Sequence, residues 1–253
     1  MLKRYFSKTN LCWIALTAVV FTVVTVLINA GLLGSYYQIT LYNICINIIL
    51  AVSLNLIIGI CGQFSLGHAG FMCIGAYSAA IMVKSMPNMG GFAIGIVIGL
   101  IISAIAALIV SIPTLRLRGD YLAIATLGFA EIIRAIFQWD RLGPVTNGAN
   151  ALKSFPTFSS FNIENANGEV VLRLSTFVPF LLVAVCIGIM VLLINSTYGR
   201  AFKAIREDEV AAEAMGINLA KHKRMAFCIS SFFAGVGGGL FAMFANQAQA
   251  KTF

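Results

Sequence analysis

Long apolar runs alternate along the chain with short polar connections, and this alternation sets the expected fold. A helix needs about 20 apolar residues to cross roughly 30 Å of hydrocarbon. The runs of about this length cover residues 11–30, 38–60, 66–83, 91–112, 121–139, 176–195 and 225–246. The pattern predicts an all-α, polytopic membrane protein with about seven transmembrane helices, which form one domain over residues 1–253.

Composition excludes a soluble globular protein. Of the 253 residues, 60% are hydrophobic and only 10% are charged, and the mean hydropathy is +0.93. A soluble domain carries roughly 25% charged residues. The chain therefore lacks the residues from which an aqueous surface is built.

The basic residues predict which side of the membrane each connection faces. If the N-terminus is cytoplasmic, the cytoplasmic segments hold eleven of them: Lys3, Arg4, Lys8, Arg116, Arg118, Arg200, Lys203, Arg206, Lys221, Lys223 and Arg224. The other side then holds five: Lys84, Arg141, Lys153, Arg173 and Lys251. Positive residues favour the cytoplasmic side. We therefore expect a cytoplasmic N-terminus, an external loop at 140–175 and a cytoplasmic loop at 195–224, and we attribute the positive charge to topology and not to nucleic-acid binding.

Small residues recur at every fourth position in two of the runs. The fourth run carries Gly91, Gly95 and Gly99, and the seventh carries Gly235 and Gly239. Transmembrane helices associate through close packing and interhelical hydrogen bonds. We therefore interpret these glycines as helix-packing ridges and not as a ligand site.

Three asparagines form a stripe along the second run. Asn43, Asn47 and Asn55 share a four-residue spacing with Ala51, and each step of four turns the face by about 40°. An amide that faces lipid costs several kcal/mol. The stripe must face other helices or a water-filled path, so both interhelical hydrogen bonding and substrate contact stay open.

Opposite charges lie within the fifth run. Glu131 and Arg134 are three residues apart. A single ion at the bilayer centre costs on the order of 2.5–3.5 kcal/mol, and a partner at this spacing offsets part of that cost. A structural ion pair is the favoured interpretation, and a proton relay is the alternative.

The stretch GQFSLGHAGFMCIGAY, Gly62–Tyr77, places Gln63, Ser65 and His68 among glycines between two apolar runs. Each glycine destabilises a continuous helix by up to about 1 kcal/mol relative to alanine. A break at membrane depth must be buried in protein or line a cavity, where a half-helix N-terminus can hold substrate. A plain cytoplasmic turn explains the same residues, and in both cases Ser65 is the predicted N-cap.

Cysteine and histidine provide no evidence for a metal site. The six cysteines, Cys12, Cys45, Cys61, Cys73, Cys186 and Cys228, lie in or beside apolar runs without a C-x-x-C pair, and the two histidines are far apart in sequence. Buried free thiols behave as small apolar residues. We predict no metal and no disulfide.

Four segments carry a family pattern. They are SLNLIIGICGQFSLGHAGFMCIGAYSAA (53–80), LRLRGDYLAIATLGFAEIIR (115–134), TNGAN (146–150) and YGRAFKAIREDEVAAEAMGINLAKHK (198–223). In this order they resemble the LivM-type permeases of branched-chain amino acid ABC importers. The resemblance implies an ABC-importer permease of a bacterial cytoplasmic membrane, with no ATPase site and no bound cofactor of its own.

The same resemblance implies three kinds of partner. Cytoplasmic ATPase subunits use the ATP, a second homologous permease completes the pathway, and an extracytoplasmic solute-binding protein delivers substrate. Within the bundle, Gln63, Ser65 and His68 and the asparagine stripe are the candidate polar contacts for substrate.

The cytoplasmic loop is the expected site of coupling. Acidic residues followed by alanines and a glycine around Glu207–Gly216 are typical of a short amphipathic helix that lies across the membrane face. ABC-importer permeases dock such a loop on the ATPase through the pattern E-A-A, three residues, then Gly. Ala211 and Ala212 fit this pattern, whereas Val210 occupies the Glu position. The expected coupling residues are Arg206, Glu207, Asp208, Glu209, Ala211, Ala212, Glu213 and Gly216.

Two alternatives to this function stay open. Permeases for urea or a related amide share much of the pattern, and a self-contained secondary transporter would use Glu131, Arg134 and His68 for ion coupling. Because the permeases that the chain resembles continue beyond the position of Phe253, we also expect it to be part of a longer protein.

Overall fold

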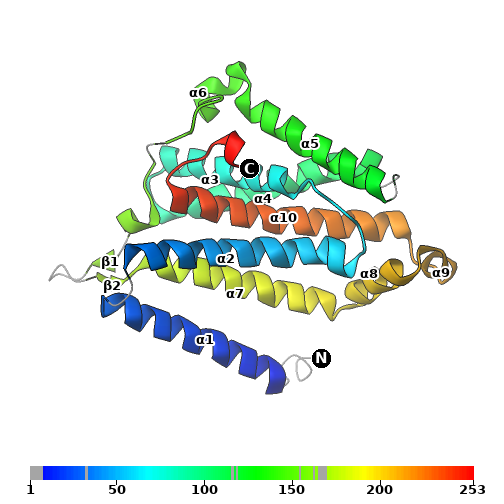
Figure 1. The fold of residues 1–253 in the computed structure, drawn as a ribbon, viewed down its shortest axis with the longest axis horizontal. Helices are drawn as coiled ribbons and strands as arrows, with labels where there is room; N and C mark the ends of the chain where they lie inside the picture. The colour runs from blue at the N-terminus through cyan, green and yellow to red at the C-terminus, as the bar shows by residue number, and fades with distance from the viewer. Residues whose placement is uncertain are drawn as a thin grey trace.

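The computed structural model describes residues 8–31, 34–114, 117, 119–153, 155–161, 163–164 and 170–253. The long helices lie alongside one another in a bundle, with two short helices at one end and a small hairpin at the other (Figure 1). In chain order, the helices, π- and 3-10-helical turns (η) and strands are α1 (Lys8–Asn29), α2 (Ser35–Asn55), η2 (Leu56–Ile60), α3 (His68–Ser85), α4 (Met89–Thr114), α5 (Asp120–Gln138), η3 (Asp140–Leu142), α6 (Gly143–Thr146), η4 (Phe158–Phe161), β1 (Ile163–Glu164), β2 (Val170–Leu172), α7 (Leu174–Ile194), α8 (Thr197–Glu207), α9 (Glu209–Ala214), α10 (Leu219–Ala245) and η5 (Ala250–Thr252).

Within these described residues, four helices are long and apolar enough to cross a membrane: α2 with η2, α4, α7 and α10. A fifth span results if α5 and the η3–α6 segment, which meet at 53°, are counted together. The two other predicted runs correspond to α3 and to α1, whose apolar part is Thr17–Ile28. The class is therefore an all-α membrane protein, apart from one small hairpin, with four or five candidate spans.

The central position of α3 explains why it is less apolar than α4 and α7. Eleven of its eighteen residues are buried, among them Gly75, Tyr77 and Ser78. It packs against α10, α4 and α5. Since most of its surface faces protein and not lipid, small and polar residues replace the large aliphatic ones of an outer helix.

Glycines bring α3 and α10 into backbone contact. A Cβ added to Gly75 would collide with the carbonyl of Gly235, and one added to Gly238 would collide with the carbonyl of Met72. A Cβ on Gly239 would lie 3.3 Å from a side-chain atom of α4. In lipid there is no hydrophobic driving force between helices, so close backbone packing of this kind is a main source of their association.

The small-residue ridge of α4 packs on α3 through two of its three predicted glycines. A Cβ on Gly95 would lie 2.9 Å from a Cα atom of α3, and one on Gly99 would lie 3.2 Å from Gly75 Cα. Gly91 instead packs against the carbonyl of Met86, in the turn that precedes its own helix.

At the end of the bundle away from α8 and α9, the segment before β1 meets the segment after α10. The backbones of Leu152 and Ala248 exchange hydrogen bonds of 2.8 and 3.0 Å. The Ala250 N–H then donates to the hydroxyl of Tyr77 in α3, at 3.1 Å. This contact holds the last residues against α3, where Phe253 reaches the groove between α3 and α5.

Candidate functional site

The second span ends in an irregular turn. After Asn55 the helix widens into the π-helical turn η2, and the Gln63 N–H donates to the Ile57 carbonyl at 3.0 Å beyond it. The Asn55 side chain covers Gly59 so closely that a Cβ there would collide with the amide. Single π-helical turns inside α-helices are frequent at functional sites.

The chain then runs without helical structure through residues 61–67, which we call the re-entrant segment. Gly62, with φ +74°, reverses the direction of the chain beside Arg206 of α8. At the other end, Gly67 lies against Thr126, six residues and about 9 Å along α5. The segment therefore rises from the end of the bundle into its interior. Non-helical backbone at this depth is tolerated only where protein covers it or a cavity is lined.

The side chains of the re-entrant segment alternate in the same sense as those of a lipid-exposed strand, with polar side chains inward and apolar ones outward. Gln63 and Ser65 are 4% and 3% exposed, whereas Phe64 and Leu66 are 49% and 47% exposed. Neither amide atom of Gln63 has a hydrogen-bond partner among the residues that the structure describes. The polar side chains thus point into the protein and the apolar ones point out of it.

Hydrogen bonds tie the re-entrant segment to α5 and the start of α3 to α2. The Leu66 N–H donates to Thr126 Oγ1 at 3.1 Å, and His68 Nε2 lies 2.7 Å from Ser53 Oγ. Ser230 of α10 donates in turn to the Ser53 carbonyl at 2.5 Å. The sequence had singled out His68 but not its partners, because a lone serine or threonine in an apolar run has no distinctive spacing.

The prediction of Ser65 as the N-cap is wrong. The N-cap of α3 is Gly67, and the Ser65 hydroxyl accepts only from the Gly67 N–H, at 3.4 Å. Ser65 lies two residues before the N-cap position, so its hydroxyl does not reach the first turn of α3.

The asparagine stripe lies apart from this cluster. Asn47 and Asn55 are exposed and Asn43 is half-buried, whereas Ser53, which meets His68, is fully buried. No hydrogen bond joins the three amides to any residue that the structure describes. The candidate pathway residues therefore form two sets. The asparagines lie on exposed or half-buried parts of α2, and His68 packs against the buried Ser53 on another face of that helix. Contact of either set with substrate stays a prediction.

The charged loop (residues 195–224) forms two short helices and not one. Ser196 caps α8, and Phe202 and Ile205 bury the apolar face of that helix. Asp208 caps α9 by accepting from the N–H groups of Val210 and Ala211, at 2.8 and 3.1 Å. The break between the helices thus falls at the best capping residue in the loop.

The predicted coupling residues surround α9. Ala212 is buried, whereas Ala211 and Glu213 are exposed, and Gly216 ends the segment with φ +83°. Glu209 forms an ion pair of 2.5 Å with Lys223 at the start of α10. This pair fixes α9 against the next membrane helix.

The outer face of α9 is unusually apolar for an exposed loop. Val210 is 74% exposed and Met215 is 83% exposed. A shallow hollow of about 430 Å³ lies between Glu213 and Ala220, after the end of α9. The residue at the Glu position of the family pattern, Val210, therefore points away from the bundle.

One side chain joins the charged loop to the broken helix. Arg206 Nη1 donates to the Gly59 carbonyl at 2.8 Å, and its guanidinium also pairs with Glu207. A Cβ on Gly62 would lie 2.9 Å from the Arg206 side chain. The end of α8 thus holds both η2 and the start of the re-entrant segment.

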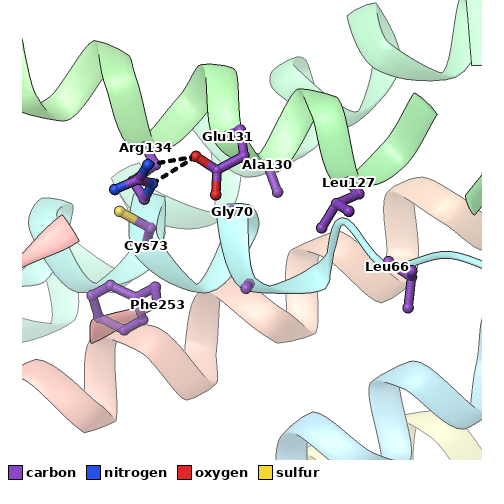
Figure 2. A pocket seen from close by; sticks show the side chains of 9 residues that line it. Leu66, Gly70, Cys73, Leu127, Ala130, Glu131, Arg134 and Phe253 are labelled. Carbon is purple, nitrogen blue, oxygen red and sulfur yellow. Dashed lines mark hydrogen bonds and ion pairs between the residues drawn. The ribbon is translucent and has the colours of Figure 1, made fainter. Parts of the chain in front are cut away.

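The ion pair of α5 lines a separate pocket. Glu131 and Arg134 face α3 above Gly70 and Cys73, with Phe253 on the far side (Figure 2). The pocket has a volume of about 60 Å³. It lies between α3 and α5, and Leu66 of the re-entrant segment borders it at one end.

The described residues contain no cluster of three side chains that suits a metal ion, and their cysteines are unpaired. The Cys12 side chain and the predicted topogenic residues Lys3, Arg4, Arg116 and Arg118 lie outside the described part of the chain.

Comparison with known proteins identifies the family. Residues 36–253 match the permease component of branched-chain amino acid transport systems. The chain is 35% identical over 216 residues to the high-affinity branched-chain amino acid transport system permease protein LivM of Salmonella typhimurium, and equally to that of Escherichia coli. These alignments cover 78% of this chain but 50% of each relative, so the chain spans about half the length of both LivM proteins.

A more distant relative is the nucleoside ABC transporter permease protein NupC of Lactococcus lactis, 23% identical over 72% of this chain and 59% of its own length. No solved structure matches the chain. The family match extends from α2 to the last residue and includes the re-entrant segment, the ion pair of α5 and the charged loop. The chain therefore belongs to the branched-chain amino acid transport system permease family.

Proposed function

We propose that this chain is the permease subunit of an ATP-driven importer and carries branched-chain amino acids across a bacterial cytoplasmic membrane. The family match and the 35% identity to two LivM proteins support this substrate class. Import would require cytoplasmic ATPase subunits, a second homologous permease and an extracytoplasmic solute-binding protein. ATP is used by the ATPase, and this chain supplies the gate.

The proposed topology has seven crossings and a cytoplasmic N-terminus. The four or five candidate spans are joined by α1 and by α3, whose 18 residues extend for about 27 Å. α8 and α9 then lie in the cytoplasm, and α6 and the β1–β2 hairpin lie outside. The excess of basic residues on the side of the charged loop supports this orientation.

The hydrogen bond from Arg206 to the Gly59 carbonyl carries the proposed mechanism. The exposed Val210 and Met215 offer an apolar surface to the ATPase. When ATP binding moves α9 and α8, Arg206 transmits the displacement to η2 and the re-entrant segment. Gln63 and His68 would then change their surroundings as access switches from one side to the other.

The exposed asparagines support a partner at the face of α2. Unpaired amides that face hydrocarbon cost several kcal/mol each. The second permease on this face would enclose Asn47 and Asn55 in a polar interface or a water-filled path between the subunits.

Reconstitution of the complete complex in proteoliposomes tests the function. We expect accumulation of radiolabelled leucine that depends on ATP and on the binding protein. Uptake by this chain alone, driven by an ion gradient, would instead establish a secondary transporter. ATP-driven uptake of urea without leucine would assign the complex to the amide permeases.

A further inference from the structure

The ion pair of α5 leaves half of its hydrogen-bonding capacity unused. Arg134 Nη2 and Nε lie 2.6 and 2.8 Å from the same carboxylate oxygen, Glu131 Oε2. Within the described residues, nothing else bonds Glu131 Oε1 or Arg134 Nη1. The carboxylate side chain is 59% exposed and the guanidinium side chain 37% exposed. One acceptor and one donor therefore remain unused on two accessible side chains.

This pair is poorly explained as a stabilising strut. Glu131 lies eleven residues along α5, about 16 Å from its start and so near the middle of a membrane span. A partner at this spacing offsets only part of the cost of the two ions, which is on the order of 2.5–3.5 kcal/mol each at the bilayer centre. Ionisable residues inside the membrane mark substrate or ion pathways by default.

An apolar pocket lies directly beside the two charges. Leu66, Leu127, Cys73 and Phe253 line it together with the pair itself (Figure 2). Its 60 Å³ has room for about four or five water-sized groups. Gly70 forms part of its floor, where a Cβ would lie only 3.0 Å from the backbone of α5. The volume and the apolar lining suit a short branched aliphatic side chain.

We infer that Glu131 and Arg134, with the α3–α5 pocket, bind the zwitterion of an aliphatic α-amino acid on its way through the permease. The substrate ammonium donates to Glu131 Oε1, and the substrate carboxylate accepts from Arg134 Nη1. The aliphatic side chain enters the pocket beside Leu127. This inference rests on the proposed function, and it places a substrate site between α3 and α5, bordered by Leu66 of the re-entrant segment and distinct from the asparagine stripe.

Charge balance favours this class of ligand over others. The pair is neutral and a zwitterion is neutral, so binding adds no net charge to the membrane interior. Charge-assisted hydrogen bonds are about twice as strong as neutral ones. Urea and nucleosides carry neither an ammonium nor a carboxylate group, and they would leave both ionic groups without a counter-charge.

Equilibrium binding to the permease complex in nanodiscs, without the solute-binding protein, tests the site. The probes are radiolabelled leucine, leucinol, which lacks the carboxylate, and 4-methylpentanoate, which lacks the ammonium. Arg134→Gln should weaken leucine at least about tenfold and leave leucinol unchanged or tighter. Glu131→Gln should weaken leucine similarly and leave 4-methylpentanoate unchanged or tighter. Arg141→Gln, at the end of the same span, is the matched control and should bind leucine as the wild type does.

The wild-type affinity for leucine in both glutamine variants would overturn the inference. If these variants fail to fold, Leu127→Trp provides the test of the site, because the tryptophan fills the pocket and keeps both charges. It should weaken leucine at least about tenfold and glycine much less, and an unchanged leucine affinity would overturn the site. ATP-driven leucine uptake by the wild-type complex is measured in parallel, to separate this result from the proposed function. If the wild type imports leucine but none of the substitutions changes leucine binding, the site is rejected and the proposed function is kept.

Discussion

Gln63 has the least satisfied surroundings of the polar residues in the re-entrant segment. Its amide is buried without a partner among the described residues, although such an arrangement costs about 1–3 kcal/mol. Two residues further on, the Ser65 hydroxyl accepts a long hydrogen bond of 3.4 Å from the Gly67 N–H. Gln63 is therefore the polar side chain of the segment whose surroundings depend most on a bound partner.

Arg206 is the residue on which the proposed coupling depends most directly. Arg206→Met keeps the aliphatic stem and removes the donor to the Gly59 carbonyl. We expect leucine uptake to fall at least about tenfold while the ATPase still co-purifies, because the docking residues Val210 and Met215 are unchanged.

Arg200→Met, on the exposed side of the same helix, provides the control and should import normally. The measurement is ATP-driven uptake together with ATP hydrolysis in the same proteoliposomes. Full uptake by Arg206→Met would show that α8 and η2 are not mechanically joined through this bond.

At the scale of elements, the bundle contains two kinds of helix. α10 is 72% buried over its span and α7 only 22%, although both are long enough to cross a membrane. The inner helices α3 and α10 use glycine at their contact, whereas the outer ones present large aliphatic side chains such as Ile109 and Leu192. The inner pair therefore forms a rigid centre around which the peripheral elements can move.

A single methyl group at the centre should separate the two inner helices. In Gly238→Ala, the new Cβ would collide with the Met72 carbonyl, and backbone atoms cannot move aside as a flexible side chain does. We expect a loss at or above the upper end of the roughly 1–3 kcal/mol that overpacking costs. The thermal unfolding temperature in detergent should fall accordingly.

Gly188→Ala in α7 is the matched comparison, because no atom lies within 4 Å of the added Cβ. Alanine is also the better helix former, by about 1 kcal/mol. The unfolding temperature of the Gly188→Ala variant should be equal to that of the wild type or higher. Equal stability of the two variants would contradict the central contact.

At the scale of the whole molecule, sidedness follows from the ends of the bundle. α8 and α9 lie at one end and the β1–β2 hairpin at the other (Figure 1). The charged loop carries Arg200, Lys203 and Arg206 on the first of these short helices and further basic residues at the start of α10. The orientation with this end in the cytoplasm keeps the basic residues on the favoured side.

Labelling with a membrane-impermeant thiol reagent tests this orientation. Val145→Cys, on α6, should react in intact cells, because Val145 is exposed on the proposed external side. Met215→Cys, next to α9, should react only after the membrane is opened. The reverse result would place the charged loop outside and remove the basis for an ATPase contact.

The helices were predictable because the bilayer imposes their length. The runs 91–112 and 176–195 correspond to α4 at Met89–Thr114 and α7 at Leu174–Ile194. The run 225–246 corresponds to α10, which starts earlier, at Leu219, since Asn218 caps it and its basic first turns extend the helix beyond the apolar part. A chain that cannot leave backbone groups unpaired in hydrocarbon has little choice of secondary structure.

The candidate site could be predicted only as a set of residue types. His68, Gln63 and Glu131 stood out because polar groups in apolar runs are costly, and the glycines of the break were equally visible. Their surroundings could not be read from the pattern. Ser53 meets Ser230 across 177 positions of sequence, and such a contact depends on how each helix is rotated.

By itself, then, the sequence determined the class of protein, the approximate ends of most helices, and where the helical run breaks. The tertiary structure decided which face of each helix points inward: Gln63 into the protein, Asn47 out of it, and the ion pair of α5 toward an apolar pocket. The physical reason is that lipid and the interior of a membrane protein are both apolar. Hydrophobicity therefore sets helix length strongly but helix rotation only weakly, and close packing and hydrogen bonds between distant residues decide the rest.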